Sequence, residues 1–499
     1  MPAPPAYPDL LRALALGTAR RDLDPAVGQW LDSRDAIDPT ADQSEYLLAA
    51  VGLAERLYRR HTMRVHTPSD TKGNTAPEET RPAPGPRLTR GLQLILEGTY
   101  PGLLDEAVEI VIRRGTRIPF FLLPAFHLRA AALLNEDYPR ALRYLKASGE
   151  RGHWLARQHP DWAALTSDYD YVAAYRSEEL PAAKAQLLGR WRRRDPPAAR
   201  HALQKDWPQQ SPRNQEVLLQ GLKTGLGPDD WPWLREALGP KRKGVRRALT
   251  EVLLLAREPE VMADFTVLAR AVVSTAGGFS STLQHPELKE KLATYGGVKA
   301  PQTLPQRLLE ILPPEVWAEV TGLDLPTFWR SRKPLELRNA ARAIEAYRDP
   351  EQATAFVRFL LFEQPAQFDP ALGGELVRLL STPTFDALYD ELLSGQPNVL
   401  LLRSLPRLLA LQRDTPWSER LSRAMMNQLV DGLSDRQLDY GLQRELAGQW
   451  KRAIPLLHVE LFPWLRQQLH ATTERYDAFG KLATELLQTT AFRRELHRP

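Results

Sequence analysis

The sequence of 499 residues contains no cysteine. Without thiols the chain cannot form disulfide bonds, use a thiolate as a nucleophile or hold zinc through cysteine ligands. Disulfide bonds are rare in reducing compartments, so the absence of cysteine is compatible with a cytoplasmic protein. We therefore expect a cytoplasmic location.

Long apolar runs and targeting signals are missing as well. Residues 1–5 (MPAPP) lack the basic region and the apolar stretch of a signal peptide. The strongest apolar run, residues 118–126, contains two prolines and is too short to span a bilayer. We therefore expect no contact with a membrane.

Motifs of catalysis and of cofactor binding are also missing. Residues 221–227 (GLKTGLG) follow a helical pattern rather than a strand, so a helix C-cap and a turn explain their glycines better than a phosphate loop. No Gly-x-Ser-x-Gly elbow is present. The ten histidines show no ligand spacing, since His61 and His66 are five residues apart and His153 and His159 are six.

We therefore predict no catalytic residue, no cofactor and no metal site. Whether the chain is an enzyme stays open, because acid–base catalysis needs only two residues that the fold brings together.

Instead of catalytic and cofactor motifs, the sequence has many prolines and a helical periodicity of apolar residues. It contains 42 prolines and 29 glycines, and proline is tolerated at the first turn of a helix but not in its interior. Asp195-Pro196 and Ser211-Pro212 are expected helix starts, each with an N-cap residue before the proline. No alternating run of β-branched residues predicts a strand. The fold class we predict is all-α, a HEAT-like helical-repeat solenoid with helix pairs stacked into a superhelix.

Changes in composition divide the chain. We predict an N-terminal helical segment at 1–66, a flexible proline-rich linker or loop at 67–90 and a helical domain with HEAT-like repeats at 91–275. A loop at 276–303 and C-terminal helical repeats at 304–499 follow.

Two segments indicate repeats. Val245, Ala248, Leu249, Val252 and Leu253 are spaced i, i+3, i+4, i+7 and i+8, which predicts a continuous apolar stripe on one helix.

The second segment covers residues 349–447. Asp349-Pro350, Thr382-Pro383 and Thr415-Pro416 are expected helix starts at intervals of 33 residues, and leucine and methionine positions align with them. A period of this length with one helix pair per unit is typical of a helical solenoid.

Positive charge is concentrated in one part of the chain. The whole chain carries +5, whereas residues 184–247 contain 15 Lys or Arg and 6 Asp or Glu, a balance of +9. Such a segment can bind nucleic acid or an acidic partner, or can simply be a solvated helix surface. The candidate cations are Arg190, Arg192, Arg193, Arg194, Lys241, Arg242, Lys243, Arg246 and Arg247.

Tryptophan accompanies this charge. Trp191, Trp207, Trp231 and Trp233 lie in the same segment, where they either stack on bases of a single strand or pack between helices. The position of Trp233 at the opening of an expected helix favours packing.

A further motif consists of Gly152, Trp154, Leu155, Pro160 and Trp162. Together with residues 15–21 (ALGTARR) and 234–253, it resembles the signature of an uncharacterised bacterial family of HEAT-like helical proteins. His159 stands where asparagine is commoner in that family. The physical interpretation of the motif is structural, with a glycine for close helix approach, a proline that ends a helix and tryptophans that pack.

The resemblance implies a partner rather than a reaction. Members of that family are typically encoded beside a SWIM zinc-finger protein, a MoxR-type AAA+ ATPase and a von Willebrand A-domain protein. This implies a partner protein in a chaperone-like or metal-insertion system, and it supplies no catalytic residue.

These observations leave two hypotheses for the function of the chain. The first is a non-enzymatic scaffold for protein interaction, accessory to such an ATPase and A-domain system, because stacked helix pairs offer an extended surface. The alternative is a nucleic-acid-binding HEAT-like protein involved in DNA repair, like HEAT-like DNA glycosylases. The partner, the oligomeric state and the cellular process stay open.

Overall fold

The computed structural model describes residues 51, 75–239, 242–274, 278–280, 283–299, 302–363, 368–396, 398–434, 440–473 and 478–498. The chain divides into two compact units, Met1–Thr75 and Ala76–Pro499. The boundary falls inside the predicted linker. The helices expected at 1–66 and the motif at 15–21 lie outside the described residues, except for Val51, which is helical.

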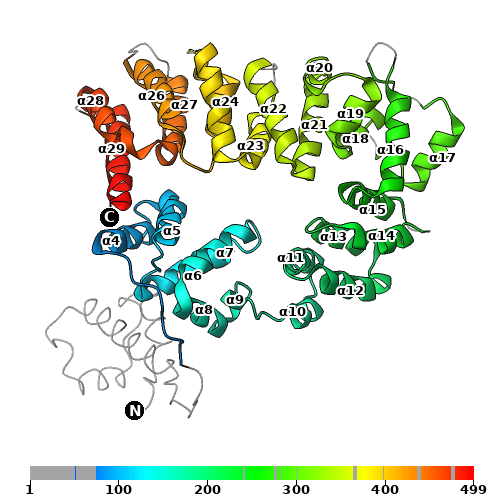
Figure 1. Ribbon diagram of the computed structural model, residues 1–499, viewed down its shortest axis with the longest axis horizontal. Coiled ribbons are helices and arrows are strands. Elements are labelled where there is room, and N and C mark those ends of the chain that lie inside the picture. Colours follow the sequence, from blue (N-terminus) through cyan, green and yellow to red (C-terminus); the bar gives the residue numbers. More distant parts are fainter. Residues whose placement is uncertain are drawn as a thin grey trace, which may run out of the picture. The chain divides into compact units, whose positions relative to one another are not determined.

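The described part of the second unit is helical (Figure 1), which confirms the all-α class. Beside helices and loops it contains one isolated antiparallel bridge, between Val273 and Phe279. None of the helices in this part of the chain combines the length and the apolarity that crossing a bilayer needs.

The α-helices up to the middle of the chain are α4 (Pro86–Leu96), α5 (Leu104–Arg113), α6 (Leu123–Ala132), α7 (Tyr138–Ala147), α8 (Gly149–Gln158), α9 (Pro160–Ala163), α10 (Tyr171–Ser177), α11 (Pro181–Arg192), α12 (Pro196–Asp206), α13 (Pro212–Leu222), α14 (Trp231–Ala237), α15 (Lys243–Leu255) and α16 (Pro259–Val272). Four short 3-10 helices lie between them, η1 (Pro101–Leu103), η2 (Phe120–Leu122), η3 (Trp207–Gln209) and η4 (Pro228–Asp230).

The helices that follow are α17 (Pro286–Thr294), α18 (Leu304–Ile311), α19 (Pro314–Thr321), α20 (Leu325–Arg330), α21 (Pro334–Tyr347), α22 (Pro350–Glu363), α23 (Pro370–Leu379), α24 (Thr382–Gly395), α25 (Leu405–Ala410), α26 (Glu419–Ser434), α27 (Tyr440–Ala453), α28 (Phe462–Thr473) and α29 (Ala478–His497). The 3-10 helices η5 (Ile454–Leu456) and η6 (Val459–Leu461) lie between α27 and α28.

Proline and a capping side chain start many of these helices. The Asp195 carboxylate accepts a hydrogen bond from the amide of Ala198 at 3.0 Å, and α12 begins at the following proline. Ser211 caps α13 in the same way through the amide of Asn214, at 3.3 Å. Both predicted starts are confirmed, because a proline at N1 has no N–H to leave unsatisfied and a preset φ.

The three starts predicted at intervals of 33 residues have different outcomes. Helix α22 begins at Pro350, behind the carboxylate of Asp349. Helix α24 begins one residue early, because Ser381 rather than Thr382 is its N-cap. The third prediction is wrong: α26 begins at Glu419, and the hydroxyl of Thr415 instead accepts a hydrogen bond from Nε of Arg413 at 2.8 Å.

The predicted linker and loop are more structured than their composition indicates. Helix α4 begins at Pro86, within the segment expected to be a linker or an exposed loop. The segment before it packs on the helices, since Arg81 Nη2 donates a hydrogen bond to the carbonyl of Lys146 at 2.7 Å. The loop predicted at 276–303 contains one short helix, α17.

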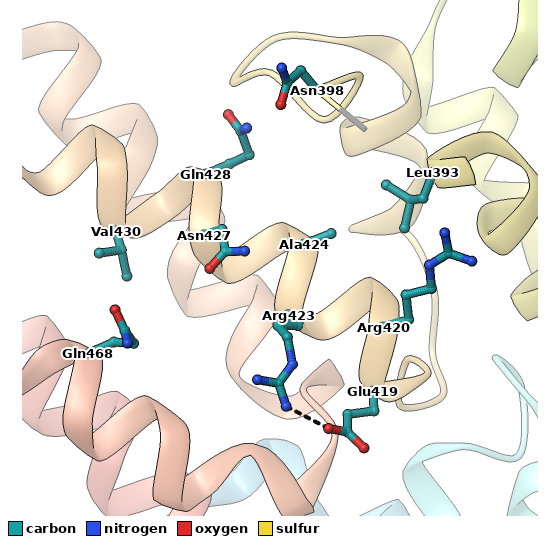
Figure 2. A pocket seen from close by; sticks show the side chains of 10 residues that line it. All are labelled: Leu393, Asn398, Glu419, Arg420, Arg423, Ala424, Asn427, Gln428, Val430 and Gln468. Atoms are coloured by element: carbon teal, nitrogen blue, oxygen red, sulfur yellow. Dashed lines mark hydrogen bonds and ion pairs between the residues drawn. The ribbon is translucent and has the colours of Figure 1, made fainter. Parts of the chain in front are cut away.

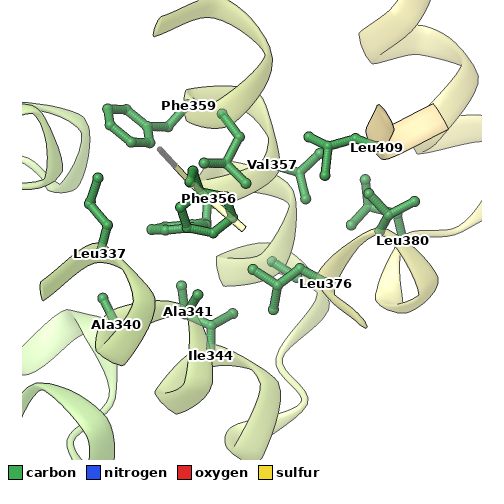
Figure 3. Close-up of a cluster of buried hydrophobic side chains, with 14 of the residues drawn as sticks. Leu337, Ala340, Ala341, Ile344, Phe356, Val357, Phe359, Leu376, Leu380 and Leu409 are labelled. Carbon is green, nitrogen blue, oxygen red and sulfur yellow. The ribbon is translucent and has the colours of Figure 1, made fainter. Parts of the chain in front are cut away.

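Two hydrophobic clusters form the interior of the second unit. One is built from α4 to α9 and also takes in Leu496 of α29, while the other runs from α10 to α29. The predicted stripe on α15 is buried in the larger cluster, with Val245, Leu249, Val252 and Leu253 at 0 % exposure. Figure 3 shows how side chains of α21, α22, α23 and α25 meet in the same cluster.

The contacts between helices run along the second unit and return to its first helices. Helix α11 packs on α13 and α13 on α15, and the contacts continue through α18, α21, α23 and α25. At the other end of the unit, α29 packs on α27 and α28 and also on α4 and α5 (Figure 1). The last helix of the chain therefore covers the first helices of its own unit.

A buried ion pair holds this closure. The guanidinium of Arg493 is fully buried and contacts the carboxylate of Glu106 at 2.7 and 3.1 Å. Its Nη1 also donates to the carbonyl oxygens of Ile454 and Leu457 at 3.0 and 2.5 Å. Burial by itself raises the pKa of Glu106, but the hydrogen bond from His497 and the charge of Arg493 outweigh it, so the pKa lies below its usual value.

Glycine allows the closest helix crossing, between α11 and α13. A Cβ at Gly221 would lie far inside van der Waals contact with the carbonyl oxygen of Ala185. A Cβ at Gly189, on the other side of the same crossing, would lie 3.5 Å from the carbonyl oxygen of Gly221, an ordinary contact. The crossing therefore leaves room for a methyl group at Gly189 but not at Gly221.

Replacement of Arg493 by Met should lower the free energy of unfolding by about 3 kcal/mol, because it leaves Glu106 buried without its main partner. Urea unfolding of the full chain, followed by circular dichroism, measures the change. Arg494→Met is the matched control, since Arg494 pairs with Glu460 at 3.6 Å on the surface. Its loss should stay below about 1 kcal/mol, and equal losses in the two variants would contradict a special role for the closure.

Gly221→Ala should lower the free energy of unfolding by about 2 kcal/mol, because the new methyl group forces α11 and α13 apart. Gly189→Ala should leave stability unchanged or raise it by up to about 0.5–1 kcal/mol, since alanine is the better helix former. The same urea titration compares them. Equal effects of the two substitutions would show that the crossing is not as close as described.

Candidate binding surface

The basic run at the end of α11 separates into buried and open side chains. Arg192 is fully buried and contacts the buried carboxylate of Asp230 at 2.8 and 3.2 Å. The same guanidinium donates to the carbonyl oxygens of Thr224 and Gly225 at 2.7 and 2.8 Å, where α13 ends. Arg192 is therefore a structural residue that a ligand in solution cannot reach.

The side chain of Arg194 also stabilises the fold. It donates hydrogen bonds to the carbonyl oxygens of Thr166 and, at 3.2 Å, Ser167, which follow α9. Its guanidinium lies 5.2 Å from the ring centroid of Tyr171. This side chain thus joins the smaller hydrophobic cluster to the larger one.

Arg190 and Arg193 have neither of these roles. They lie one turn apart on α11, and neither forms an ion pair with any residue that the structure describes. Nε of Arg190 is buried and has no hydrogen-bond partner. Two guanidinium groups therefore keep their hydrogen-bonding capacity for a ligand or solvent.

Both arginines line a cavity of 360 Å³, called the α11 pocket below. Helices α11 and α13 form two of its walls, and the turn between α6 and α7 forms the third. Its lining residues are Leu134, Asn135, Glu136, Tyr138, Ala182, Ala185, Gln186, Gly189, Arg190, Arg193, Val217, Gln220, Gly221 and Thr224. The cavity combines small apolar side chains with amides, hydroxyls and the two guanidinium groups.

The second group of predicted cations lies elsewhere, at the start of α15. Arg242 and Lys243 are exposed, and Arg247 Nη1 donates to the carbonyl of Gly296 at 3.2 Å. Arg246 is half-buried, with Nε lacking a partner. Lys241 lies outside the described residues. None of the described cations of this group lines the α11 pocket, so the fold does not bring the two predicted groups into one cavity.

A row of ion pairs continues from α13 to α21. Lys223 lies 3.8 Å from Glu251, which also pairs with Arg307. Arg307 and Arg342 each lie 3.4 Å from Glu310. These five side chains, called the ion-pair ladder below, line a groove of 160 Å³. Their charges largely compensate one another, with three cations beside two carboxylates.

A larger cavity of 850 Å³ lies over α26 and α28 (Figure 2). Its two arginines are engaged within the chain. Arg423 donates to Glu419 at 2.7 Å, and Arg420 donates to the hydroxyl of Ser394 at 2.9 Å. This cavity therefore offers amides such as Asn427 rather than free charge.

A third hollow, of 420 Å³, lies on another side of α11. Lys184 pairs with Asp206 at 2.9 Å inside it, and the hydroxyl of Tyr175 donates to the same carboxylate at 3.3 Å. Burial raises the pKa of Tyr175, with the carboxylate of Asp206 as the next cause. Asp206 of this hollow thus binds Lys184 and Tyr175, while Arg176 and Lys205 of its lining have no described ion pair.

The family-like motif is part of the interior. Gly152 is buried in α8, where a Cβ would collide with the side chain of Ser148, and Leu155 packs on the smaller hydrophobic cluster. Trp154 is half-buried, and Pro160 is the first residue of α9. Trp162 is buried and stacks on His159, with ring centroids 4.1 Å apart.

His127 lies beside this motif, with its ring centroid 5.2 Å from that of Trp162. It is fully buried, and burial lowers its pKa to about 4, so the imidazole is neutral. In the part of the chain that the structure describes, no three His, Asp or Glu side chains gather into a group that could hold a metal ion.

The tryptophans of the basic segment pack between helices. Trp191 and Trp207 are buried, and Trp233 contacts Trp207 edge to face at 5.5 Å. Nε1 of Trp231 donates to the carbonyl of Ala256 at 3.1 Å. These contacts match the packing interpretation rather than an array of open stacking faces.

Sequence reasoning missed the amides of the α11 pocket. Gln186, Arg190 and Arg193 are spaced i, i+4 and i+7, which places them on one helix face. Gln220 of α13 and Thr224, which follows that helix, lie across the pocket from them. The helical spacing of Gln186 with the arginines was a signal in the sequence, whereas the pairing of α11 with α13 was not.

Comparison with known proteins identifies a family whose function is unknown. The family model described as "Family of unknown function (DUF5691)" matches residues 9–499. Neither a curated protein nor a solved structure matches the chain significantly.

Arg192→Gln should lower the free energy of unfolding by about 3 kcal/mol, because Asp230 then keeps only Arg200, at 3.2 Å, as a cationic partner. Arg193→Gln, one residue further on, should change it by less than about 0.5 kcal/mol, since that side chain is exposed. Urea unfolding of the full chain measures both. A loss of similar size in the two variants would refute the division of the basic run into structural and open residues.

Proposed function

The chain belongs to DUF5691, a family of unknown function, and from that premise we propose that it is a non-enzymatic scaffold that binds a partner protein. The observation that carries this proposal is a series of polar and charged side chains on successive helices. It begins at the α11 pocket and continues through the ion-pair ladder, with Gln220 of the pocket and Lys223 of the ladder one turn apart on α13.

The charge pattern of these side chains supports a protein partner. A nucleic acid is a dense polyanion, and binding it needs many cations that are free to neutralise phosphates. The cations of the ladder already have carboxylate partners, and two carboxylates stand among them. A surface with alternating charges suits another protein, whose own surface carries both signs.

Contacts between successive helix pairs support a repeat architecture of the HEAT-like kind. Several of these contacts join side chains 33 residues apart in the sequence. They are the ion pairs Arg330–Glu363 and Arg358–Glu391, the hydroxyl pair Tyr138–Tyr171 and the hydrogen bond from Arg413 to the carbonyl of Leu380. An array in which each pair contacts its neighbours presents a long surface without any catalytic group.

We propose a partner from the system that the sequence motifs imply, a MoxR-type AAA+ ATPase or a von Willebrand A-domain protein. A cytoplasmic location belongs to the same proposal. DNA binding through the exposed Arg242 and Lys243 is the competing function.

A tagged full-length chain, purified gently from its native cell, should retain an AAA+ ATPase or an A-domain protein at a fixed ratio, as mass spectrometry and size-exclusion chromatography would report. In parallel, fluorescence anisotropy should detect no binding of a short DNA duplex at ~50 mM salt.

Two outcomes would contradict the proposal. One is a chain that elutes without any bound protein, and the other is duplex binding that weakens steeply with salt. In the second case Arg242→Glu combined with Lys243→Glu should abolish the DNA signal, which would establish the competing function.

A further inference from the structure

The α11 pocket contains two arginines whose charge no described ion pair compensates. Its two arginines share the cavity with one carboxylate, Glu136, and no ion pair joins Glu136 to either of them among the described residues. In the cavity over α26 both arginines bind acceptors of the chain, and in the hollow beside Lys184 that lysine pairs with Asp206, while Arg176 and Lys205 there have no described ion pair. The two guanidinium groups of the α11 pocket are therefore available to an external anion.

One donor of the pocket is already desolvated. Nε of Arg190 is buried and has no acceptor. A buried donor without a partner costs about 1–3 kcal/mol, and an acceptor within hydrogen-bond reach of it would recover that energy. Arg193 is exposed at the rim, so it can approach the same acceptor from solvent. Two guanidinium groups in the lining of one cavity are suited to a carboxylate.

The remaining lining fits a peptide. Gln186, Gln220 and Asn135 carry amides, each with a donor and an acceptor, and they match the N–H and C=O groups of an extended backbone. Ala182, Val217 and other small apolar side chains fill the space between the polar groups. The volume of 360 Å³ lies near the lower end of the roughly 300–1,000 Å³ found for ligand cavities.

The walls of the pocket are held rigidly. The close crossing at Gly221 fixes α11 against α13, and buried Arg192 ties the end of α13 to α11 through Thr224 and Gly225. The third wall is fixed by the buried hydroxyl contact of Tyr138 with Tyr171, at 3.2 Å. Preorganised walls reduce the entropy lost on binding.

We propose that the α11 pocket binds an acidic segment of a partner protein, with an Asp, Glu or C-terminal carboxylate between Arg190 and Arg193 and the peptide backbone along the amides. This inference rests on the proposed scaffold function and names the chemistry that the partner presents. Nucleic acid is the less suitable occupant, because Lys223, the cation next to the pocket at the end of α13, is paired with Glu251 of the ladder.

Fluorescence anisotropy on the full-length chain tests the proposal. The probe is a labelled peptide with four glutamates among glycines and serines, and its counterpart carries glutamine at those positions. The glutamate peptide should bind at least roughly tenfold more tightly than the glutamine peptide, and Arg190→Gln combined with Arg193→Gln should remove roughly tenfold of that affinity.

Arg242→Gln combined with Lys243→Gln is the matched control. It removes the same charge from the same basic segment but outside the pocket, so affinity should change by less than about twofold. Circular dichroism checks that both double variants are folded, which is expected because none of the four side chains has a described ion pair.

Three results would overturn the proposal. They are equal losses in the two double variants, the same affinity for the glutamate and glutamine peptides, and a DNA duplex that binds through Arg190 and Arg193. Failure here is distinguishable from failure of the scaffold, because a partner that still co-purifies with the Arg190 and Arg193 double variant would show binding through another surface.

Discussion

Buried arginines that donate to the carbonyl oxygens ending neighbouring helices hold this structure together. The last carbonyl groups of a helix lack partners within it and carry partial negative charge. Arg192 reaches Thr224 and Gly225 after α13, Arg413 reaches Val377 and Leu380 at the end of α23, and Arg493 reaches the carbonyls that follow α27. Each arginine fixes one helix pair against another, and Arg493 closes the unit because Glu106 lies across the contact with α5.

The same arrangement decides which charges remain available. A helix turns by about 100° per residue, so adjacent arginines at the end of α11 point in different directions. Arg192 is directed into the interior and pairs with Asp230, while Arg190 and Arg193 share the opposite side and line the α11 pocket. The positive charge that seemed to be one patch in the sequence thus divides into buried residues that stabilise the fold and residues that line the proposed binding pocket.

Recognition without catalysis is a coherent role for such a molecule. The candidate binding surface combines a pocket with free guanidinium groups and a ladder whose charges are compensated. A partner whose charges do not match those of the ladder would leave charged groups unpaired in the interface. The ladder can therefore discriminate between partners without a strong net attraction. The pocket can then provide one specific anchor for a carboxylate. Both features depend on several helices, and so does the rigidity of the crossing at Gly221.

The sequence by itself determined the helices. Proline after Asp195 or Ser211, and the apolar spacing on α15, are local signals that tertiary contacts did not need to correct. At Thr415 the local signal failed, because Arg413 uses that hydroxyl and Ser418 caps the helix instead. Only the tertiary structure decided that Arg192 is buried, that α29 meets α5 and that amides of α11 and α13 surround Arg190. Those facts depend on which helices pack together, and the apolar spacing within one helix does not identify the helix that packs against it.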